Sequence, residues 1–296
     1  VDKSTFIIFV KEEDINMAVR IVMDSTADYS AMEIEKRGIT CIPMTITFGE
    51  EQYTDGVDIT KEEFFEKLIE GEAFPKTSQP SPARFEACFE EAKQAGDSVV
   101  AILISGALSG TIQSANLAKD MVEYENIHIV DSKSATLGIR ILVDRAVHMR
   151  DQGKSAEEIV TELENLKSRI RIYAGLDTLE YLYKGGRLSK TQASLGKLAN
   201  IKPIVTIDED GSVIMCGKQL GVKHVCRQIA KLLEEEAPDR NYPVYFLYAY
   251  DKKNCITLIH SLQKKEMDFG EVKTRGIGPT IGTHIGPGAF GIVYVK

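Results

Sequence analysis

Hydroxyl side chains gather where a predicted strand ends or a predicted helix begins. D-S-T at residues 24–26 and S-G-A-L-S-G-T at residues 105–111 each follow an apolar run, and T-S-Q-P-S at residues 77–81 precedes a helix. Ligands of open α/β sheets bind beyond the carboxyl ends of the strands. Hydroxyl groups and free N–H groups at a helix start suit a carboxylate or a phosphate. These clusters predict an anion site, unless Ser109 only caps a helix and the glycines only turn the chain.

His284 is the histidine whose surroundings could bring it to a ligand. It precedes G-P-G-A-F-G at residues 286–291, which matches the G-x-G-x-x-G pattern of dinucleotide-binding loops. That pattern requires a following helix and an acidic residue about 20 positions on. Only five residues follow, and they resemble a strand, so the nucleotide interpretation fails. We expect a tight glycine turn between two strands that sets His284 beside a ligand, and we expect the other histidines to be structural or on the surface.

The composition is typical of a soluble cytoplasmic protein. A net charge of -8 and a pI near 5.3 argue against binding to nucleic acid or to anionic lipid, so we expect at most transient contact with a membrane. Five cysteines without a C-x-x-C pair favour reduced thiols over disulfides or a zinc site. Residues 1–16 carry no signal-peptide pattern, and Met17 looks like a more natural start. We treat residues 1–16 as an extension of unknown status.

The common catalytic patterns match this sequence poorly. Residues 106–110 read G-A-L-S-G rather than G-x-S-x-G, and neither a P-loop nor metal-ligand spacing is found. We therefore expect no catalytic residue, no metal and no cofactor. The alternative is a serine-dependent lipid esterase or acyl hydrolase, with Ser109 or Ser105 as nucleophile and His284 as base. The missing nucleophile elbow and the lack of a group to orient His284 argue against it.

The elements that must position these side chains change in character near residue 150. Residues 17–150 alternate apolar runs with amphipathic segments, which predicts an N-terminal α/β domain with a doubly wound, mostly parallel sheet. Residues 151–296 include a strand–turn–strand pattern around D-E-D-G at 208–211, which predicts a hairpin in a C-terminal α/β domain with a mixed sheet. The predicted strands are 20–23, 39–48, 98–104, 127–130, 204–207, 212–215, 243–249 and 270–274, and the predicted helices are 60–70, 81–96, 155–169, 222–236 and 252–265.

Taken together, the motifs resemble those of the DegV family of bacterial fatty-acid-binding proteins. The resemblance runs from Met17 to Lys296 and depends on the order and spacing of short motifs that are weak individually. These are D-S-T-A-D at 24–28, P-K-T-S-Q-P-S at 75–81, L-S-G-T at 108–111, D-S at 131–132, L-Y-K-G-G-R-L-S at 182–189, K-P at 202–203 and T-H-I-G-P-G at 283–288.

The resemblance implies a non-catalytic protein of two α/β domains that holds one long-chain fatty acid, such as palmitate or stearate, between them. It implies that the carboxylate is bound by Thr77 and Ser109, with His284 beside it. A phosphate- or anion-binding domain is a further alternative, which differs in that its ligand has no acyl tail. As supporting site residues we predict Ser78, Gly110, Thr111, Thr26, Arg187 and Gly286.

The resemblance also implies a partner. Some members of the family hand the acyl group to a separate fatty-acid kinase, and the resulting acyl phosphate enters phospholipid synthesis. Family members often carry an arginine after the hairpin that is implicated in engaging this kinase, whereas this chain has Leu220 at the corresponding position. The kinase partnership is therefore in question, and Lys218, Lys223 or Arg187 are candidates to replace that arginine.

Overall fold

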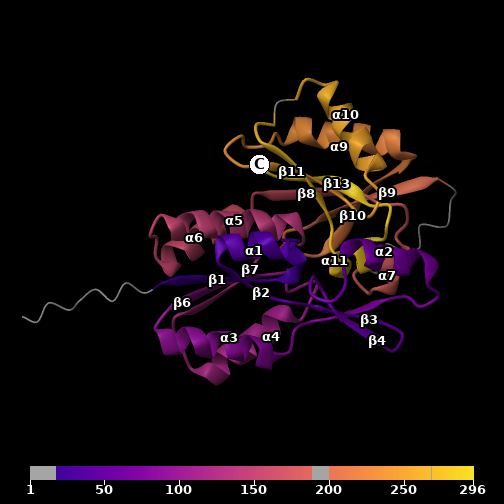
Figure 1. Cartoon of the computed structure of the whole chain (residues 1–296). Coiled ribbons are helices and arrows are strands. Elements are labelled where there is room, and N and C mark those ends of the chain that lie inside the picture. Colours follow the sequence, from indigo (N-terminus) through magenta and orange to yellow (C-terminus); the bar gives the residue numbers. More distant parts are fainter. Residues whose placement is uncertain (1–17, 189–199, 268) are drawn as a thin grey trace, which may run out of the picture.

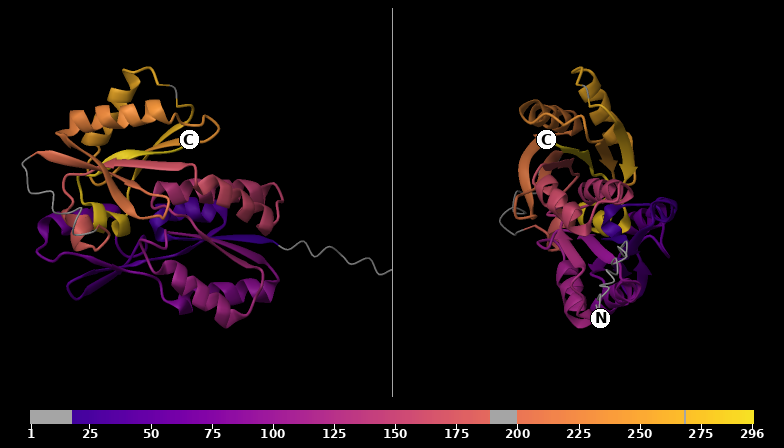
Figure 2. Two further views of the ribbon diagram at one scale, coloured as in Figure 1. Left: turned by 180° about the vertical axis from the view of Figure 1, so that it is seen from behind. Right: turned by 90° about the vertical axis from the view of Figure 1, so that its left-hand side faces the viewer.

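Two β-sheets lie one above the other, with helices between them and on both outer faces (Figures 1 and 2). The computed structural model describes residues 18–188, 200–267 and 269–296. The predicted extension at residues 1–16 and Ser189 of the resemblance lie outside the described residues. Among the described residues, no helix is long and apolar enough to cross a membrane.

The first sheet is parallel throughout, and its order is β2 (Ile39–Ile42), β1 (Val19–Asp24), β6 (Ser98–Leu103) and β7 (Ile127–Asp131). Two helices cover one face, α3 (Pro82–Ala95) and α4 (Thr111–Val122), and two cover the other, α5 (Leu137–Asp151) and α6 (Ala156–Lys167). Because both faces are covered, apolar side chains occupy both sides of a strand, and every residue of β6 is buried. The predicted doubly wound parallel sheet is confirmed.

The second sheet is mixed, and its order is β10 (Val213–Leu220), β9 (Ile201–Ile207), β8 (Ile170–Gly175), β13 (Phe290–Val295), β11 (Val244–Tyr248) and β12 (Val272–Gly276). β11 and β12 pair in parallel, whereas the other neighbours are antiparallel. Helices α9 (Val222–Glu235) and α10 (Lys253–Gln263) cover the outer face (Figure 1). The mixed sheet and the β9–β10 hairpin are confirmed. The prediction missed β8, because no glycine or proline separates this strand from the helix before it.

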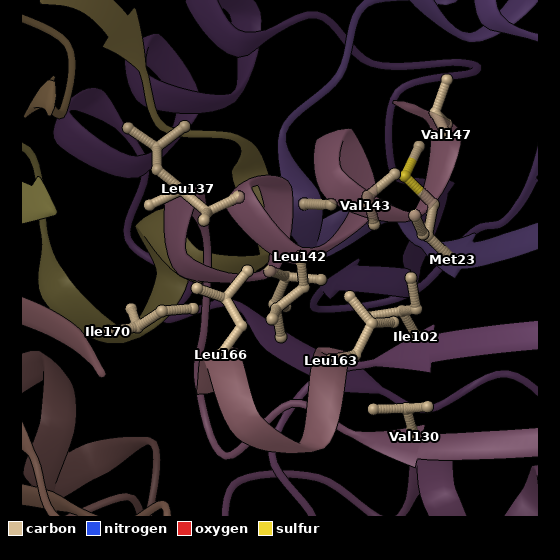
Figure 3. Packing of buried hydrophobic residues seen from close by; sticks show 14 of the residues in the cluster. Met23, Ile102, Val130, Leu137, Leu142, Val143, Val147, Leu163, Leu166 and Ile170 are labelled. Atoms are coloured by element: carbon tan, nitrogen blue, oxygen red, sulfur yellow. The ribbon is translucent and has the colours of Figure 1, made fainter. Parts of the chain in front are cut away.

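Helix α5 lies between the two sheets and contacts both of them. Figure 3 shows Leu142 and Val143 of α5 in one cluster with Met23 and Ile102 of the first sheet and Ile170 of the second. α6, which follows α5, packs on β6 and β7 of the first sheet. The two sheets therefore share a continuous apolar core. The proposed domain boundary at residue 150 stays a prediction.

A third, smaller sheet lies beside the other two, and its order is β4 (Glu51–Thr54), β3 (Thr45–Phe48) and β5 (Lys76–Ser78). The single strand region predicted at residues 39–48 is wrong, because the chain breaks at Pro43 and gives β2 to the first sheet and β3 to the third. Three helices lie next to this small sheet, namely α2 (Lys61–Glu70), α7 (Glu180–Lys184) and α11 (Pro279–Ile285) (Figure 1). α2 begins where the helix at 60–70 is predicted, at a capping box in which Thr60 and Glu63 are bonded reciprocally.

Candidate functional site

A cavity of about 310 Å³ lies where the first sheet, the small sheet and the short helices α7 and α11 meet. This volume is at the lower end of the range typical of small-molecule sites, about 300–1,000 Å³. The polar side chains that line it are Thr77, Ser78, Gln79, Ser109, Arg187, Thr280 and His284. The apolar walls include Met44, Ile104, Leu108, Leu182, Ile281 and Ile285. The cavity therefore has an apolar wall with a small set of polar groups, which is the usual design of a site for an amphipathic ligand.

Thr77 and His284 form the centre of the polar group. They stand 207 positions apart in the chain, and Thr77 Oγ1 lies 2.8 Å from His284 Nε2. The strand β5 presents Thr77 because it pairs antiparallel with β3, which places Thr77 opposite Ile46. Helix α11 presents His284 in its last turn. In this contact the imidazole N–H can donate to the hydroxyl oxygen, which leaves the hydroxyl proton for a carboxylate oxygen.

The expected location of His284 in a glycine turn between two strands is wrong. The segment starts as a helix because Pro279 is at its first turn, where proline's missing N–H costs nothing. It ends at Gly286, whose φ of 76° is unfavourable for other residues. A Cβ at Gly286 would also lie 2.5 Å from the ring of Tyr181, so the chain needs glycine there for two reasons.

His284 is electrically neutral in the folded protein. Burial, followed by the nearby Arg187 cation, lowers the pKa of its imidazole to about 3. Its Nδ1 is buried with no hydrogen-bond partner among the described residues. Gly185 packs against this nitrogen so closely that a Cβ there would lie 2.1 Å from it. His284 can therefore donate or accept a hydrogen bond at Nε2, and it adds no charge to the site.

Arg187 supplies the positive charge of the polar group. Its Nε donates to the Leu108 carbonyl at 2.9 Å and its Nη1 donates to the Gly185 carbonyl at 2.6 Å. Burial lowers its pKa from the usual arginine value, yet arginine remains protonated at any physiological pH. Arg187 thus joins the loop after β6 to the segment after α7 and places a cation beside an otherwise neutral site.

Ser109 contacts the start of α4 and also lines the cavity, although the N-cap residue of that helix is Gly110. Its Oγ lies 2.8 Å from Thr111 Oγ1 and accepts the Thr111 N–H at 3.3 Å, at the start of α4. It also lines the cavity although it is only 9% exposed. Behind it, a Cβ at Gly110 would lie 1.9 Å from Gln79 Oε1, so glycine lets the Gln79 side chain cross the loop and donate to Ser114 at 3.0 Å.

The structure brings together five of the predicted site residues along the cavity, namely Thr77, Ser109, His284, Ser78 and Arg187. Gly110 and Gly286 are next in sequence to lining residues, and Thr111 hydrogen-bonds the lining Ser109. Thr26 does not line the cavity. It is fully buried and donates its N–H at 3.0 Å and its hydroxyl to the Asp24 carboxylate, which ends β1.

Sequence reasoning missed Gln79, Thr280 and the apolar wall. Gln79 belongs to a motif of the resemblance, but a glutamine in a loop gives no signal of its own. Met44 and Ile281 have the residue types of any core position. Only their exposure to a cavity distinguishes them, and that property depends on tertiary contacts.

The arrangement does not support the esterase alternative. Ser109 hydrogen-bonds Thr111 and Ser105 donates to the Gly211 carbonyl at 2.8 Å, whereas His284 hydrogen-bonds Thr77. Among the described residues, no acceptor orients the ring of His284 through Nδ1, as a triad requires. The same part of the chain contains no group of three or more His, Cys, Asp or Glu side chains that could hold a metal ion.

Comparison with known proteins identifies the family. The family model described as "Uncharacterised protein, DegV family" matches residues 18–296. A DegV domain-containing protein of Caldanaerobacter subterraneus is 38% identical over 276 residues, which cover 93% of this chain and 98% of that protein. Among solved structures, a fatty-acid-binding DegV family protein from Thermus thermophilus has a TM-score of 0.86 at 35% identity, covering 95% of this chain and 100% of that chain. A stearic-acid-binding protein from Eubacterium ventriosum has a TM-score of 0.82 at 29% identity, covering 94% of this chain and 98% of that chain. The chain therefore belongs to the DegV family.

Proposed function

We propose that this protein is a non-catalytic carrier that binds one long-chain fatty acid, such as palmitate or stearate, in the cavity. The observation that carries the proposal is the Thr77–His284 pair in a cavity that also has apolar walls. The fatty-acid-binding proteins of Thermus thermophilus and Eubacterium ventriosum have the same fold over almost their whole length, which supports it.

In this proposal the carboxylate lies among Thr77, Ser109 and His284. Thr77 and Ser109 donate hydroxyl hydrogen bonds to it, and the neutral His284 donates at Nε2 to the Thr77 hydroxyl. A carboxylate taken out of water needs such donors, and it also needs a positive charge or a proton. Arg187 is the cation on the cavity wall, so it is suited to balance the ligand's charge.

The acyl chain lies along the apolar wall. Burying one methylene group contributes about 0.8 kcal/mol, so roughly fifteen methylenes contribute on the order of 10 kcal/mol before the costs of ordering. This is enough for tight capture without a covalent bond. A free phosphate would gain nothing from these walls, and for that reason we favour a fatty acid over the anion-binding alternative.

Delivery to a fatty-acid kinase in the cytoplasm is the finer part of the proposal. Leu220, at the position where the family often has arginine, is 60% exposed at the end of the edge strand β10. Lys218 of the same strand is exposed, so it is suited to take the place of that arginine. A pull-down of the protein with a fatty-acid kinase, repeated with Lys218→Ala, tests this part separately from lipid binding.

Organic extraction of the purified protein, followed by mass spectrometry, tests the proposed binding directly. We expect one long-chain fatty acid per chain, or uptake of added palmitate by protein stripped of lipid. Neither a bound fatty acid nor palmitate uptake would refute the proposal. Recovery of a phosphorylated ligand without an acyl tail would favour the anion-binding alternative, and turnover of acyl esters that a Ser109→Ala variant abolishes would favour the esterase.

A further inference from the structure

Asp55 is a buried carboxylate that lies behind the cavity rather than in it. It follows β4 at the start of a turn and is only 5% exposed. Its N–H donates to the Met44 carbonyl at 2.9 Å, so its backbone is tied to a residue of the cavity wall. The site as described above makes no use of this residue.

The side chain of Asp55 joins two walls of the cavity. Thr280 of α11 donates its hydroxyl to Oδ2 of Asp55 at 2.5 Å. Ser25 donates to the same oxygen at 2.9 Å and accepts the N–H of Met44 at 3.1 Å. Thr280 and Met44 both line the cavity. One carboxylate therefore holds the wall that contains Met44 and the helix that carries His284.

Holding these walls with a carboxylate costs more than a neutral side chain would. Burial, followed by the neighbouring Asp28 carboxylate, raises the pKa of Asp55 to about 6, although the hydroxyls of Thr280 and Ser25 and the Lys61 cation act in the opposite direction. An ionised group in such a place is disfavoured unless its contacts compensate. Residues that cost stability in this way are concentrated where function requires them.

The helix that Asp55 holds depends on such contacts. α11 has seven residues, which is too short for a helix to be stable by itself. Asp28 accepts the N–H of Gly278 at 2.7 Å just before the helix, and Asp55 binds its second residue. His284 lies about one turn further along the helix, so a shift at Thr280 moves the imidazole.

We propose that Asp55 is a positioning residue for the carboxylate site. Asp55 holds α11 against the wall that contains Met44, so that His284 contacts Thr77 and the cavity keeps its width. The inference rests on the proposed fatty-acid binding. It assigns to Asp55 no direct contact with the ligand.

The test compares palmitate affinity with thermal stability in lipid-free protein. Asp55→Asn keeps the size of the side chain and removes its charge, and Thr280→Val removes one hydroxyl while making the wall more apolar. We expect each variant to bind palmitate about tenfold more weakly, within the range of couplings carried through packed networks. The double variant should bind palmitate about as weakly as the single variant with the lower affinity, because both changes break the same contact.

Asp144→Asn is the matched control. Asp144 is a part-buried carboxylate that also accepts two hydroxyl hydrogen bonds, from Tyr29 at 2.7 Å and Tyr245 at 2.9 Å, away from the cavity lining. We expect it to lower the melting temperature and to leave palmitate affinity within about twofold of the wild type. Asp55 variants that lose stability but bind palmitate as the wild type does would overturn the inference. If Asp55→Asn does not fold, the Thr280→Val affinity decides alone.

A second readout separates failure of this inference from failure of the proposed function. The NMR signals of the His284 ring report its position whether or not a lipid binds. They should shift in Asp55→Asn and stay unchanged in Asp144→Asn. A wild type that takes up no palmitate defeats the proposed function, and an unmoved His284 signal in Asp55→Asn defeats the positioning role.

Discussion

Two buried polar networks in this protein have similar residue types and different surroundings. The cavity network consists of the Thr77–His284 pair and Asp55 with its partners Thr280 and Ser25. The α5 network consists of polar side chains around the helix between the sheets. Its members are Arg140, Glu33, Tyr29, Asp144 and Tyr245.

The α5 network, in which Arg37 also pairs with Asp144, contains no residue that lines the cavity. Arg140, at 1% exposure, pairs with Glu33, donates to the Asp28 carbonyl and lies 3.9 Å from the centroid of the Tyr29 ring. Asp144 accepts from Tyr29 near the first sheet and from Tyr245 of the second sheet. These contacts link the two sheets across α5 and leave no open volume beside them in the described cavities.

The cavity network has the opposite character, because its Thr77, Thr280 and His284 side chains line an open volume. Buried polarity therefore does not by itself identify a ligand site. In this protein the network that contains cavity-lining residues is the candidate site. The α5 network, which links the two sheets, stabilises the fold. The two networks should accordingly respond differently to substitution.

Arg140→Ala should give the largest effect, and it should be an effect on stability. Breaking a buried ion pair leaves an uncompensated group and costs about 3–5 kcal/mol. Because Glu33 is 29% exposed, we expect the free energy of unfolding in urea to fall by an amount near the lower figure. Palmitate affinity of the folded protein should stay the same. Arg145→Ala, which removes a more exposed pair with Glu162 on the neighbouring helix, should cost less than about 1 kcal/mol. A large loss of affinity in Arg140→Ala would end the distinction between the networks.

Thr77→Ala combined with Ser109→Ala should affect binding far more than stability. Hydrogen bonds to a charged group contribute about 1.5–3 kcal/mol each, so we expect palmitate to bind on the order of a hundredfold more weakly, measured by calorimetry. Each single change should cause a smaller loss. Thr161→Ala, at an exposed hydroxyl of α6, serves as the control and should bind as the wild type does. Unchanged affinity in the double variant would refute the assignment of the carboxylate site.

His284 should make the lipid-free protein less stable in acid. Its pKa falls to about 3 on folding. As the pH is lowered, the imidazole is therefore protonated near pH 6.5 in the unfolded chain and only near pH 3 in the folded protein. Stability from this group is therefore complete above pH 6.5 and is lost as the pH falls, by about 2 kcal/mol at pH 5.

The measurement is the difference in unfolding free energy between the wild type and His284→Gln at pH 7.5 and at pH 5. Asp55, whose pKa rises to about 6 on folding, acts in the opposite direction, since its contribution is present below about pH 4 and lost as the pH rises through 6. Because both proteins contain Asp55, its contribution cancels in the difference. A difference that does not change with pH would contradict a buried, neutral His284.

Gly185→Ala should have the smallest of these effects and should act on the cavity network alone. The added methyl would lie 2.1 Å from His284 Nδ1 and would push the ring from its place beside Thr77, so palmitate should bind about tenfold more weakly. Gly217→Ala is the control, because its Cβ meets no atom closer than 3.5 Å. Equal affinity in the two variants would show that the position of His284 does not matter for binding.

Local patterns in the sequence predicted much of the fold and part of the site. Apolar runs predicted the strands of the first sheet, and the capping box at Thr60 predicted the start of α2, because strand burial and helix capping depend on neighbouring residues. The motifs around Thr77 and Ser109 likewise contain residues that line the cavity. Predictions of this kind fail when a segment's conformation depends on distant contacts. The turn expected around His284 is such a case.

The sequence by itself determined the α/β class, the positions of the hydroxyl clusters and the glycines that allow close approach, since each follows from residue types at short separation. Only the tertiary structure decided that α11 carries His284 to Thr77 across 207 positions, that Asp55 contacts two cavity walls and that Thr26 does not line the cavity. The reason is physical. A seven-residue helix and a buried carboxylate are stable only through contacts with segments far away in the chain, and no local pattern records those contacts.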